Sequence, residues 1–279
     1  MLTLTTIADY RRWRESQPAH LCAAVFTMGA LHEGHAELAR AAREYVGAAG
    51  TVVATVFVNP TQFEDPADLA DYPRTLAADE ALLEANGVDL LLAPSVAEVY
   101  PAGGQVTVDP GSLGLVLEGA SRPGHFTGVL TVVAKLLHIT AADVALFGEK
   151  DYQQLTLIRR MVRDLVIPVR IIGVPTVRDT DGVALSSRNV RLSQRGRFQA
   201  AALPEALRQI GIALRAGHTL QQAVDAGHVH LHNNGVTDVD YLVVTGPDLG
   251  PIPAAGSARV LAAVTIEGVR LIDNMEVEI

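Results

Sequence analysis

The chain is organised around one short stretch, which reads Thr27-Met28-Gly29-Ala30-Leu31-His32-Glu33-Gly34-His35. It lies between an apolar run at 21–26 and a helical pattern at about 34–48. This order predicts a tight turn that leads from a buried strand into a helix. Gly29 and Gly34 would let the backbone of that turn approach a ligand without Cβ atoms in the way.

His32 and His35 stand at the predicted start of this helix, three residues apart. Side chains at that spacing share one helix face, and a helix N-terminus offers unpaired N–H groups and partial positive charge that suit phosphate. Two imidazoles there can donate hydrogen bonds to a charge that develops as a phosphate bond breaks. The pair is also compatible with an ordinary surface. Zinc fits less well, because the zincin helix needs His at i and i+4 and the chain has one cysteine.

Composition and charge narrow the class of protein. The 279 residues, 49% of them hydrophobic, suffice for one large or two ordinary domains with a sizeable core. No apolar run has the length of a membrane span, and no signal peptide is visible, so no membrane partner is expected. The net charge of −9 argues against a nucleic-acid surface. Cys22, the single cysteine, is expected to be a buried small hydrophobe, and a cytoplasmic location fits.

Buried strands alternate with helices as far as about residue 175. Strands are expected at 21–26, 51–58, 88–93, 142–147 and 169–174, with a short one at 105–108, and helices at about 3–16, 34–48, 75–86, 128–138 and 154–165. The alternation predicts an α/β fold with a Rossmann-like, doubly wound parallel sheet. Ligands bind such sheets outside the carboxyl ends of the strands. Three polar segments fall there, at 27–35, 59–63 and 148–151.

The pattern changes beyond residue 176. Two helices at about 194–216 and 219–234 precede strands at 238–245, 258–265 and 269–278. The sequence therefore predicts two domains, a Rossmann-like domain at 1–176 and a smaller α+β domain at 177–279.

Common nucleotide and hydrolase signatures are missing from the chain. The segment 148–151 lacks the glycine spacing of a Walker loop, no Gly-x-Gly-x-x-Gly follows the first strand, and no Gly-x-Ser-x-Gly elbow occurs. Lys150 is notable because the chain has only two lysines and otherwise uses arginine. A retained lysine hints that a compact ammonium is needed at this strand end, although a solvated turn explains it equally well.

Two further groups of polar residues suit a nucleotide and an acid. Ser186 and Ser187 offer hydroxyls, and Arg188 offers a planar fork for phosphate. Gln62 and Gln154 are neutral amides that can bind hydroxyls and a carboxylate without becoming nucleophiles. Each of these residues, taken alone, is compatible with an ordinary hydrophilic surface.

Taken together, the segments resemble the pantoate–beta-alanine ligase family of the nucleotidyltransferase superfamily, which carries a His-x-Gly-His motif. The matching stretches follow the family's order over nearly the whole chain, at 27–35, 58–63, 72–75, 122–126, 147–154, 186–189 and 270–274. Phe26 and Leu185 depart from the pattern, where the family usually has proline and methionine.

The resemblance implies a ligation in two steps. Pantoate's carboxylate would attack the α-phosphorus of Mg-ATP, giving pantoyl adenylate and pyrophosphate. The amine of β-alanine would then attack the acyl carbon, giving pantothenate and AMP. The resemblance further implies Mg²⁺ arriving with ATP as substrate, no tightly bound organic cofactor, and a homodimer. The position of the Ser-Ser-Arg loop at the join of the two domains predicts that the C-terminal domain acts as a lid.

The match assigns roles residue by residue. The implied catalytic residues are His32, His35, Lys150, Ser186, Ser187 and Arg188. The ATP contacts add Met28, Gly29, Gly148, Asp151, Val177 and Leu185. The pantoate contacts are Asn59, Gln62, Tyr72, Arg122, His125 and Gln154, of which Gln62 and Tyr72 also serve β-alanine. Asp79 is the implied Mg²⁺ contact.

Two other functions stay open on the sequence. One is a nucleotidyltransferase of the same superfamily that acts on another acid and leaves AMP on its product. The other is a non-catalytic nucleotide-binding regulator, which would not need both histidines and Lys150. An assay for AMP released when β-alanine is added separates the three.

Overall fold

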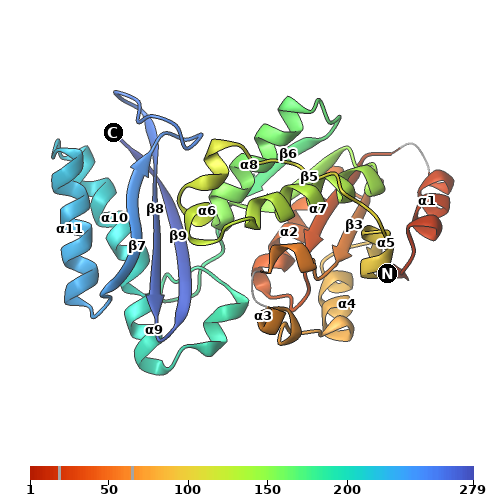
Figure 1. Cartoon of the computed structure of the whole chain (residues 1–279), viewed down its shortest axis with the longest axis horizontal. Helices are drawn as coiled ribbons and strands as arrows, with labels where there is room; N and C mark the ends of the chain where they lie inside the picture. Colours follow the sequence, from red (N-terminus) through yellow and green to blue (C-terminus); the bar gives the residue numbers. More distant parts are fainter. Residues whose placement is uncertain (18–19, 64–65) are drawn as a thin grey trace. The chain divides into compact units, whose positions relative to one another are not determined.

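A computed structural model describes residues 1–17, 20–63 and 66–279 of the chain. Its internal contacts divide it into two units (Figure 1). The first comprises Met1–Glu149 and Gln153–Pro175, and the second comprises Lys150–Tyr152 and Thr176–Ile279. Each unit has its own sheet and its own hydrophobic core.

The first unit is built on a six-stranded sheet in which every pairing is parallel. Its strands are β1 (Leu2–Leu4), β2 (Cys22–Thr27), β3 (Thr51–Val56), β4 (Leu90–Leu92), β5 (Val144–Gly148) and β6 (Arg170–Val174). Their order across the sheet is β1-β4-β3-β2-β5-β6, which confirms the doubly wound Rossmann-like prediction. The chain runs outward from β2 in both directions, and ligands bind such sheets where the order reverses.

Helices cover both faces of this sheet. Ala23 and Val25 of β2 pack in one cluster with Leu38 and other residues of α2. Cys22 and Ala24, whose side chains point to the opposite face, are also fully buried, as expected for a strand with both faces covered. The helices of this unit are α1 (Ile7–Ser16), α2 (Glu33–Val46), α3 (Pro66–Ala70), α4 (Leu76–Ala85), α5 (Val96–Val99), α6 (Glu118–Ser121), α7 (His125–Thr140) and α8 (Tyr152–Asp164), whose first residue belongs to the second unit.

The second unit packs helices on a three-stranded antiparallel sheet of order β7-β8-β9. Its elements are α9 (Gln194–Ala200), α10 (Ala202–Arg215), α11 (Leu220–Asn233), β7 (Asp238–Thr245), β8 (Ser257–Ile266) and β9 (Val269–Glu278). Leu207 and Ile210 of α10, Leu231 of α11 and Val260 of β8 are buried in its core. The predicted α+β composition is therefore confirmed.

Several elements differ from the sequence prediction. Residues 105–108 form no strand, because the N–H of Val108 donates instead to the Thr131 hydroxyl at 2.9 Å. The helix expected at 194–216 is two helices that meet at Ala201. Pro204 lies in the first turn of the second of these, where its missing N–H has no helical partner to lose. Within the described part of the chain, no helix has both the length and the apolar character needed to cross a membrane.

Candidate active site

Strand β2 lies between β3 and β5 and is parallel to both, so the carboxyl ends of the three strands meet at one edge of the first sheet. The turn that follows β2 and the loop that follows β3 begin there side by side, and the N–H of Phe57 donates to the Thr27 carbonyl at 3.0 Å. Gly148, at the end of β5, starts the third predicted segment. The sheet thus gathers the starts of all three polar segments at one edge.

The turn after β2 is held by a buried carboxylate. Asp79 on α4 is 2% exposed, and its two oxygens accept the N–H groups of Ala30 at 3.1 Å and Leu31 at 2.9 Å. Ala30 has a φ of 52°, and Gly29 one of 87°. A Cβ on Gly29 would lie 3.1 Å from an Asp79 oxygen, so this position suits glycine. Asp79 therefore stabilises the turn, and its role as a Mg²⁺ contact stays a prediction.

The two histidines close the N-terminus of α2 with a reciprocal capping box. The Nδ1 of His32 accepts the Gly34 N–H at 3.1 Å, and the Nδ1 of His35 accepts the His32 N–H at 3.2 Å. Because both Nδ1 atoms are acceptors, the neutral rings carry their hydrogen on Nε2, an assignment made from the hydrogen-bond pattern. The ring centroids are 4.2 Å apart. The pair can therefore present two Nε2–H donors at a helix N-terminus.

Gly34 makes room for this arrangement. A Cβ at this position would lie 2.9 Å from the Cε1 of His32, closer than side-chain atoms pack. A larger residue would therefore displace the ring that caps the helix. The glycine of the His-x-Gly-His motif is explained by the packing of the first histidine, beyond the close ligand approach that the sequence predicted.

The loop after β3 is organised by Asn59, which is 1% exposed. Its Nδ2 donates to the Oε1 of Gln62 at 2.9 Å, and its Oδ1 accepts the Tyr100 hydroxyl at 2.9 Å and the Thr61 hydroxyl at 3.0 Å. The amide of Asn59 is thus used inside the protein, where it orients Gln62. Tyr100 supports this loop from a distant part of the chain, and no local sequence signal indicated it.

Arg122 and His125 meet the backbone of the same loop. The carbonyl of Gln62 accepts the Nη2 of Arg122 at 3.2 Å and lies 3.2 Å from the Nδ1 of His125. The Nη1 of Arg122 lies 3.1 Å from the Nε2 of His125. His125 begins α7 after Gly124, whose φ of 80° is left-handed. Gly128 allows α7 to touch the loop, since a Cβ there would lie 2.3 Å from the Thr61 carbonyl oxygen. The structure therefore brings Gln62, Arg122 and His125 together.

Two neighbouring glutamines on α8 have different environments. Gln153 is 3% exposed, and its amide bonds the backbone of Leu113, Val116 and Glu118 at 2.8–3.0 Å. Gln154 is half-buried and makes no side-chain hydrogen bond to another described residue. Gln153 thus fixes the loop at 113–118. Among the described residues none occupies the side-chain amide of Gln154, so this amide is available to a ligand.

Lys150 belongs to the second unit, although it follows β5 directly in the chain. Its carbonyl accepts the Nδ2 of Asn274 at 3.0 Å, and its ammonium lies 3.6 Å from an Asp151 carboxylate oxygen. At the other end of the same turn, the guanidinium of Arg259 lies over the ring of Tyr152 and also donates to Asn274. The stretch 270–274 matches the family pattern, although its sequence alone indicates no role for Asn274.

The Ser-Ser-Arg segment also lies in the second unit. The Ser186 hydroxyl caps the short 3₁₀ turn Ser187–Arg191 and accepts the Arg188 N–H at 3.3 Å. The N–H of Leu185 donates to the Val177 carbonyl at 3.0 Å, next to an isolated antiparallel bridge between Arg178 and Ala184. Arg188 itself is exposed.

The remaining predicted contacts lie in the first unit. Met28 is half-buried in the turn after β2, and the ring of Tyr72 packs edge-on against Phe63 with centroids 5.5 Å apart. Phe26, which replaces the proline of the family pattern, makes an edge contact with Phe147 at 5.9 Å. This aromatic pair joins the carboxyl ends of β2 and β5.

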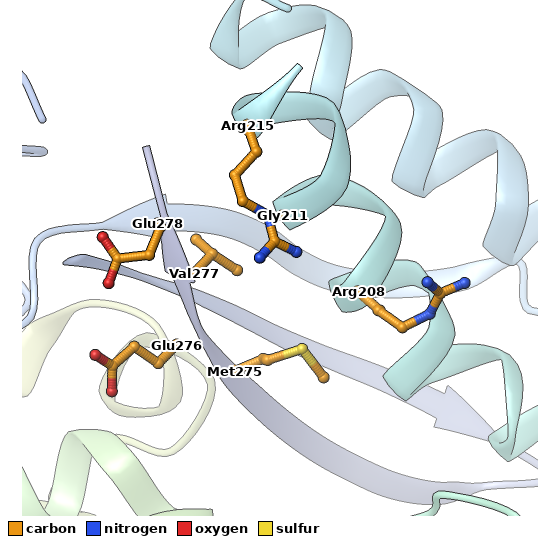
Figure 2. A pocket seen from close by; sticks show the side chains of 7 residues that line it. All are labelled: Arg208, Gly211, Arg215, Met275, Glu276, Val277 and Glu278. Carbon is orange, nitrogen blue, oxygen red and sulfur yellow. The ribbon is translucent and has the colours of Figure 1, made fainter. Parts of the chain in front are cut away.

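A hollow of 320 Å³ in the second unit is separate from these segments. Figure 2 shows it between α10 and β9, with arginine and glutamate side chains at its margin. It is lined by Arg208, Gly211, Arg215, Met275, Glu276, Val277 and Glu278. None of the sequence-predicted site residues lines it.

The chain is similar to known proteins over its whole length. The pantoate-beta-alanine ligase family model matches residues 2–276. A pantothenate synthetase of Nocardioides sp. is 54% identical over 257 residues, which cover 89% of this chain and 76% of the relative. One of Cereibacter sphaeroides is 49% identical over 281 residues, with 98% and 99% covered.

Solved structures give the same result. Pantothenate synthetase from Thermus thermophilus superposes with a TM-score of 0.90 at 46% identity, covering 99% of both chains. A pantoate-beta-alanine ligase from Francisella tularensis, complexed with beta-gamma ATP and beta-alanine, has a TM-score of 0.81 at 36% identity, with 99% of this chain and 97% of that chain covered. The chain belongs to the pantoate-beta-alanine ligase family, and it is accordingly a ligase that forms a carbon–nitrogen bond.

Proposed function

We propose that the chain joins pantoate to β-alanine through a pantoyl adenylate, with the first half-reaction at the carboxyl edge of β2 and β3. The observation that carries the proposal is the pair of neighbouring loops at that edge. One presents His32 and His35 at a helix N-terminus, and the other presents Gln62. The first suits phosphates, and the second suits the hydroxyls of a small acid.

In this proposal the protein acts by positioning and charge stabilisation. The Nε2–H groups of His32 and His35, together with the α2 N-terminus, stabilise the charge that develops as pyrophosphate leaves. Lys150 balances charge at the α-phosphate, and Ser186, Ser187 and Arg188 bind the departing phosphates. Gln62 and Gln154 hold pantoate so that its carboxylate is aligned with the α-phosphorus.

Mg²⁺ enters this proposal as part of the substrate Mg-ATP. Among the described residues, no group of three His, Cys, Asp or Glu side chains is placed to hold a metal ion. The carboxylate of Asp79 is engaged by two backbone N–H groups. Mg²⁺ is commonly bound by substrate phosphates and waters with few protein ligands, so we propose that it arrives with ATP and is not held in a protein cage.

Isotope exchange tests the order of the half-reactions. With pantoate present and β-alanine absent, labelled pyrophosphate should exchange into ATP, because the adenylate forms before the amine is used. Release of AMP should then require β-alanine. An exchange that depended strictly on β-alanine would exclude a free-standing adenylation step.

We further propose that the second unit acts as a lid during the reaction. The support is the location of Ser186, Ser187 and Arg188, which follow closely on the junction of the two units near residue 176. Closing such a segment over an acyl adenylate would protect it from water. X-ray scattering with and without a non-hydrolysable ATP analogue measures this. The radius of gyration should fall when the analogue binds, and an unchanged value would refute the lid.

We also propose that the enzyme is a homodimer, on the strength of the family resemblance alone, and that it is cytoplasmic, which fits its single buried cysteine. Light scattering at micromolar concentration measures the mass in solution. A mass of one chain at all concentrations would contradict the dimer.

A further inference from the structure

The dipeptide Asp273–Asn274 is a buried polar pair in the middle of β9, an edge strand of the second unit's sheet. The two residues are 3% and 4% exposed. Buried polar side chains carry a free-energy cost unless their hydrogen bonds are made. The partners of this pair therefore indicate what it is there to hold.

Asn274 holds the turn that contains Lys150. Its Nδ2 donates to the Lys150 carbonyl at 3.0 Å, and its Oδ1 accepts the Nη1 of Arg259 at 3.1 Å. The NH₂ group of the Asn274 side chain therefore holds Lys150, while its oxygen holds the guanidinium of Arg259. Arg259 is 6% exposed, so this contact is shielded from water.

Arg259 carries the restraint to the other end of the turn. Its guanidinium lies over the ring of Tyr152, 3.8 Å from the centroid. The Tyr152 hydroxyl donates to the Pro247 carbonyl at 2.7 Å. The tripeptide Lys150–Tyr152 is therefore held at its first residue by Asn274 and at its last by Arg259, which explains why it clusters with the second unit.

Asp273 extends the same network to the Ser-Ser-Arg segment. Its carboxylate accepts both terminal nitrogens of Arg178, at 2.7 and 2.8 Å, and the Arg178 Nη2 also donates to the Asn274 carbonyl at 3.2 Å. Arg178 pairs with Ala184 in an antiparallel bridge just before the segment. A bidentate pair of this kind fixes orientation as well as distance.

We propose that Asn274 is a positioning residue for Lys150 in the adenylation step. The inference rests on the proposed role of Lys150 at the α-phosphate. With its carbonyl pinned, the backbone of Lys150 cannot slide along the turn, so the ammonium starts from a fixed Cα. A displacement of about 1 Å at a reacting group can lower a rate by about a hundredfold.

Asn274→Asp is the most informative variant because it keeps an acceptor for Arg259 and replaces the donor to the Lys150 carbonyl with an oxygen that repels it. It also adds a negative charge beside Asp273, so a control for stability is needed. We expect pantoate-dependent pyrophosphate exchange to slow by about tenfold to a hundredfold. The KM for ATP should change by less than about threefold, since the change acts on a group used in the transition state. Asn274→Ala should lose at least as much.

A double-mutant cycle with Lys150→Ala separates positioning from general damage. If Asn274 acts through Lys150, then Asn274→Asp should cost little when Lys150 is already alanine. Losses that multiply in the double variant would overturn the proposal. If Lys150→Ala itself leaves exchange unchanged, the proposed role of Lys150 fails first, which is a distinguishable result.

Leu271→Val is the matched control on the same strand. Leu271 is buried in the core of the second unit, and its side chain is apolar and takes no part in the polar network of Asp273 and Asn274. It should lower the unfolding midpoint in urea as Asn274→Asp does, yet leave exchange within about twofold of wild type. Equal rate losses in the two variants would show that Asn274 acts only through stability, and would refute the positioning role.

Discussion

The substitution Asp79→Asn tests whether Asp79 anchors the turn after β2 or binds the metal ion. The carboxylate accepts the N–H groups of Ala30 and Leu31 from a site that is 2% exposed. Asparagine keeps one acceptor oxygen, but its amide group must face one of the two N–H donors. Hydrogen bonds to a charged group contribute about 1.5–3 kcal/mol each, and an unpaired buried donor costs about 1–3 kcal/mol. We expect a net loss of about 2–3 kcal/mol.

Thermal unfolding and adenylation kinetics together measure this effect. For a unit of this size, 1 kcal/mol shifts Tm by about 2–4 °C, so the midpoint should fall by about 4–12 °C. The exchange rate should fall as well, because the turn carries His32. The Mg²⁺ concentration that gives half the maximal rate should stay within about twofold, since an anchor has no contact with the metal.

Asp143→Asn is the matched control, at the amino end of the same sheet. The Asp143 carboxylate accepts the N–H of Cys22 at 2.7 Å. It should lower stability by about 1 kcal/mol without changing the kinetics. An unchanged Tm in Asp79→Asn, combined with a tenfold higher Mg²⁺ requirement, would refute the anchor and support the metal contact.

Three further outcomes are expected. Lys150→Arg should slow single-turnover adenylation nearly as much as Lys150→Ala, by about 3–4 kcal/mol, because a planar fork cannot replace a compact ammonium. An Arg variant that kept more than about a tenth of the wild-type rate would contradict this. Gln62→Ala should weaken pantoate by about 1–3 kcal/mol and ATP less, and equal losses in binding titrations would exclude a pantoate role. Burial raises the pKa of the Cys22 thiol to about 11, so a thiol reagent at about pH 8 should label it only as fast as the protein unfolds.

The sheet of the first unit was predictable because the composition of its strands alone indicates buried parallel strands. Thr51–Val56 is a run rich in β-branched residues whose four central residues are buried, and such runs are typical of parallel strands. β1 escaped prediction because Leu2–Leu4 pairs with β4, and three residues show no period. The break at Ala201 was missed because both sides of it have a helical pattern.

The site was predictable where function depends on a local motif. The turn at 27–35 has its glycines, histidines and helix start within a few residues. The amide of Asn59 orients Gln62 within the loop, a role that the motif alone does not indicate, and its contact with pantoate stays a prediction. Asn274 and Arg259 received no role because their contact to Lys150 and Tyr152 joins segments about a hundred residues apart. A single sequence does not encode such pairings in any period or spacing.

The discontinuous composition of the second unit bears on how this enzyme can be recombined with its relatives. A chimera cut only at the junction of 175 and 176 would pair Lys150–Tyr152 from one parent with β8 and β9 from another. Residues 150–152 would have to be transplanted with the C-terminal segment to keep their partners Asn274 and Arg259. In evolution, the same linkage would couple substitutions in this tripeptide to substitutions in β9 across the length of the gene.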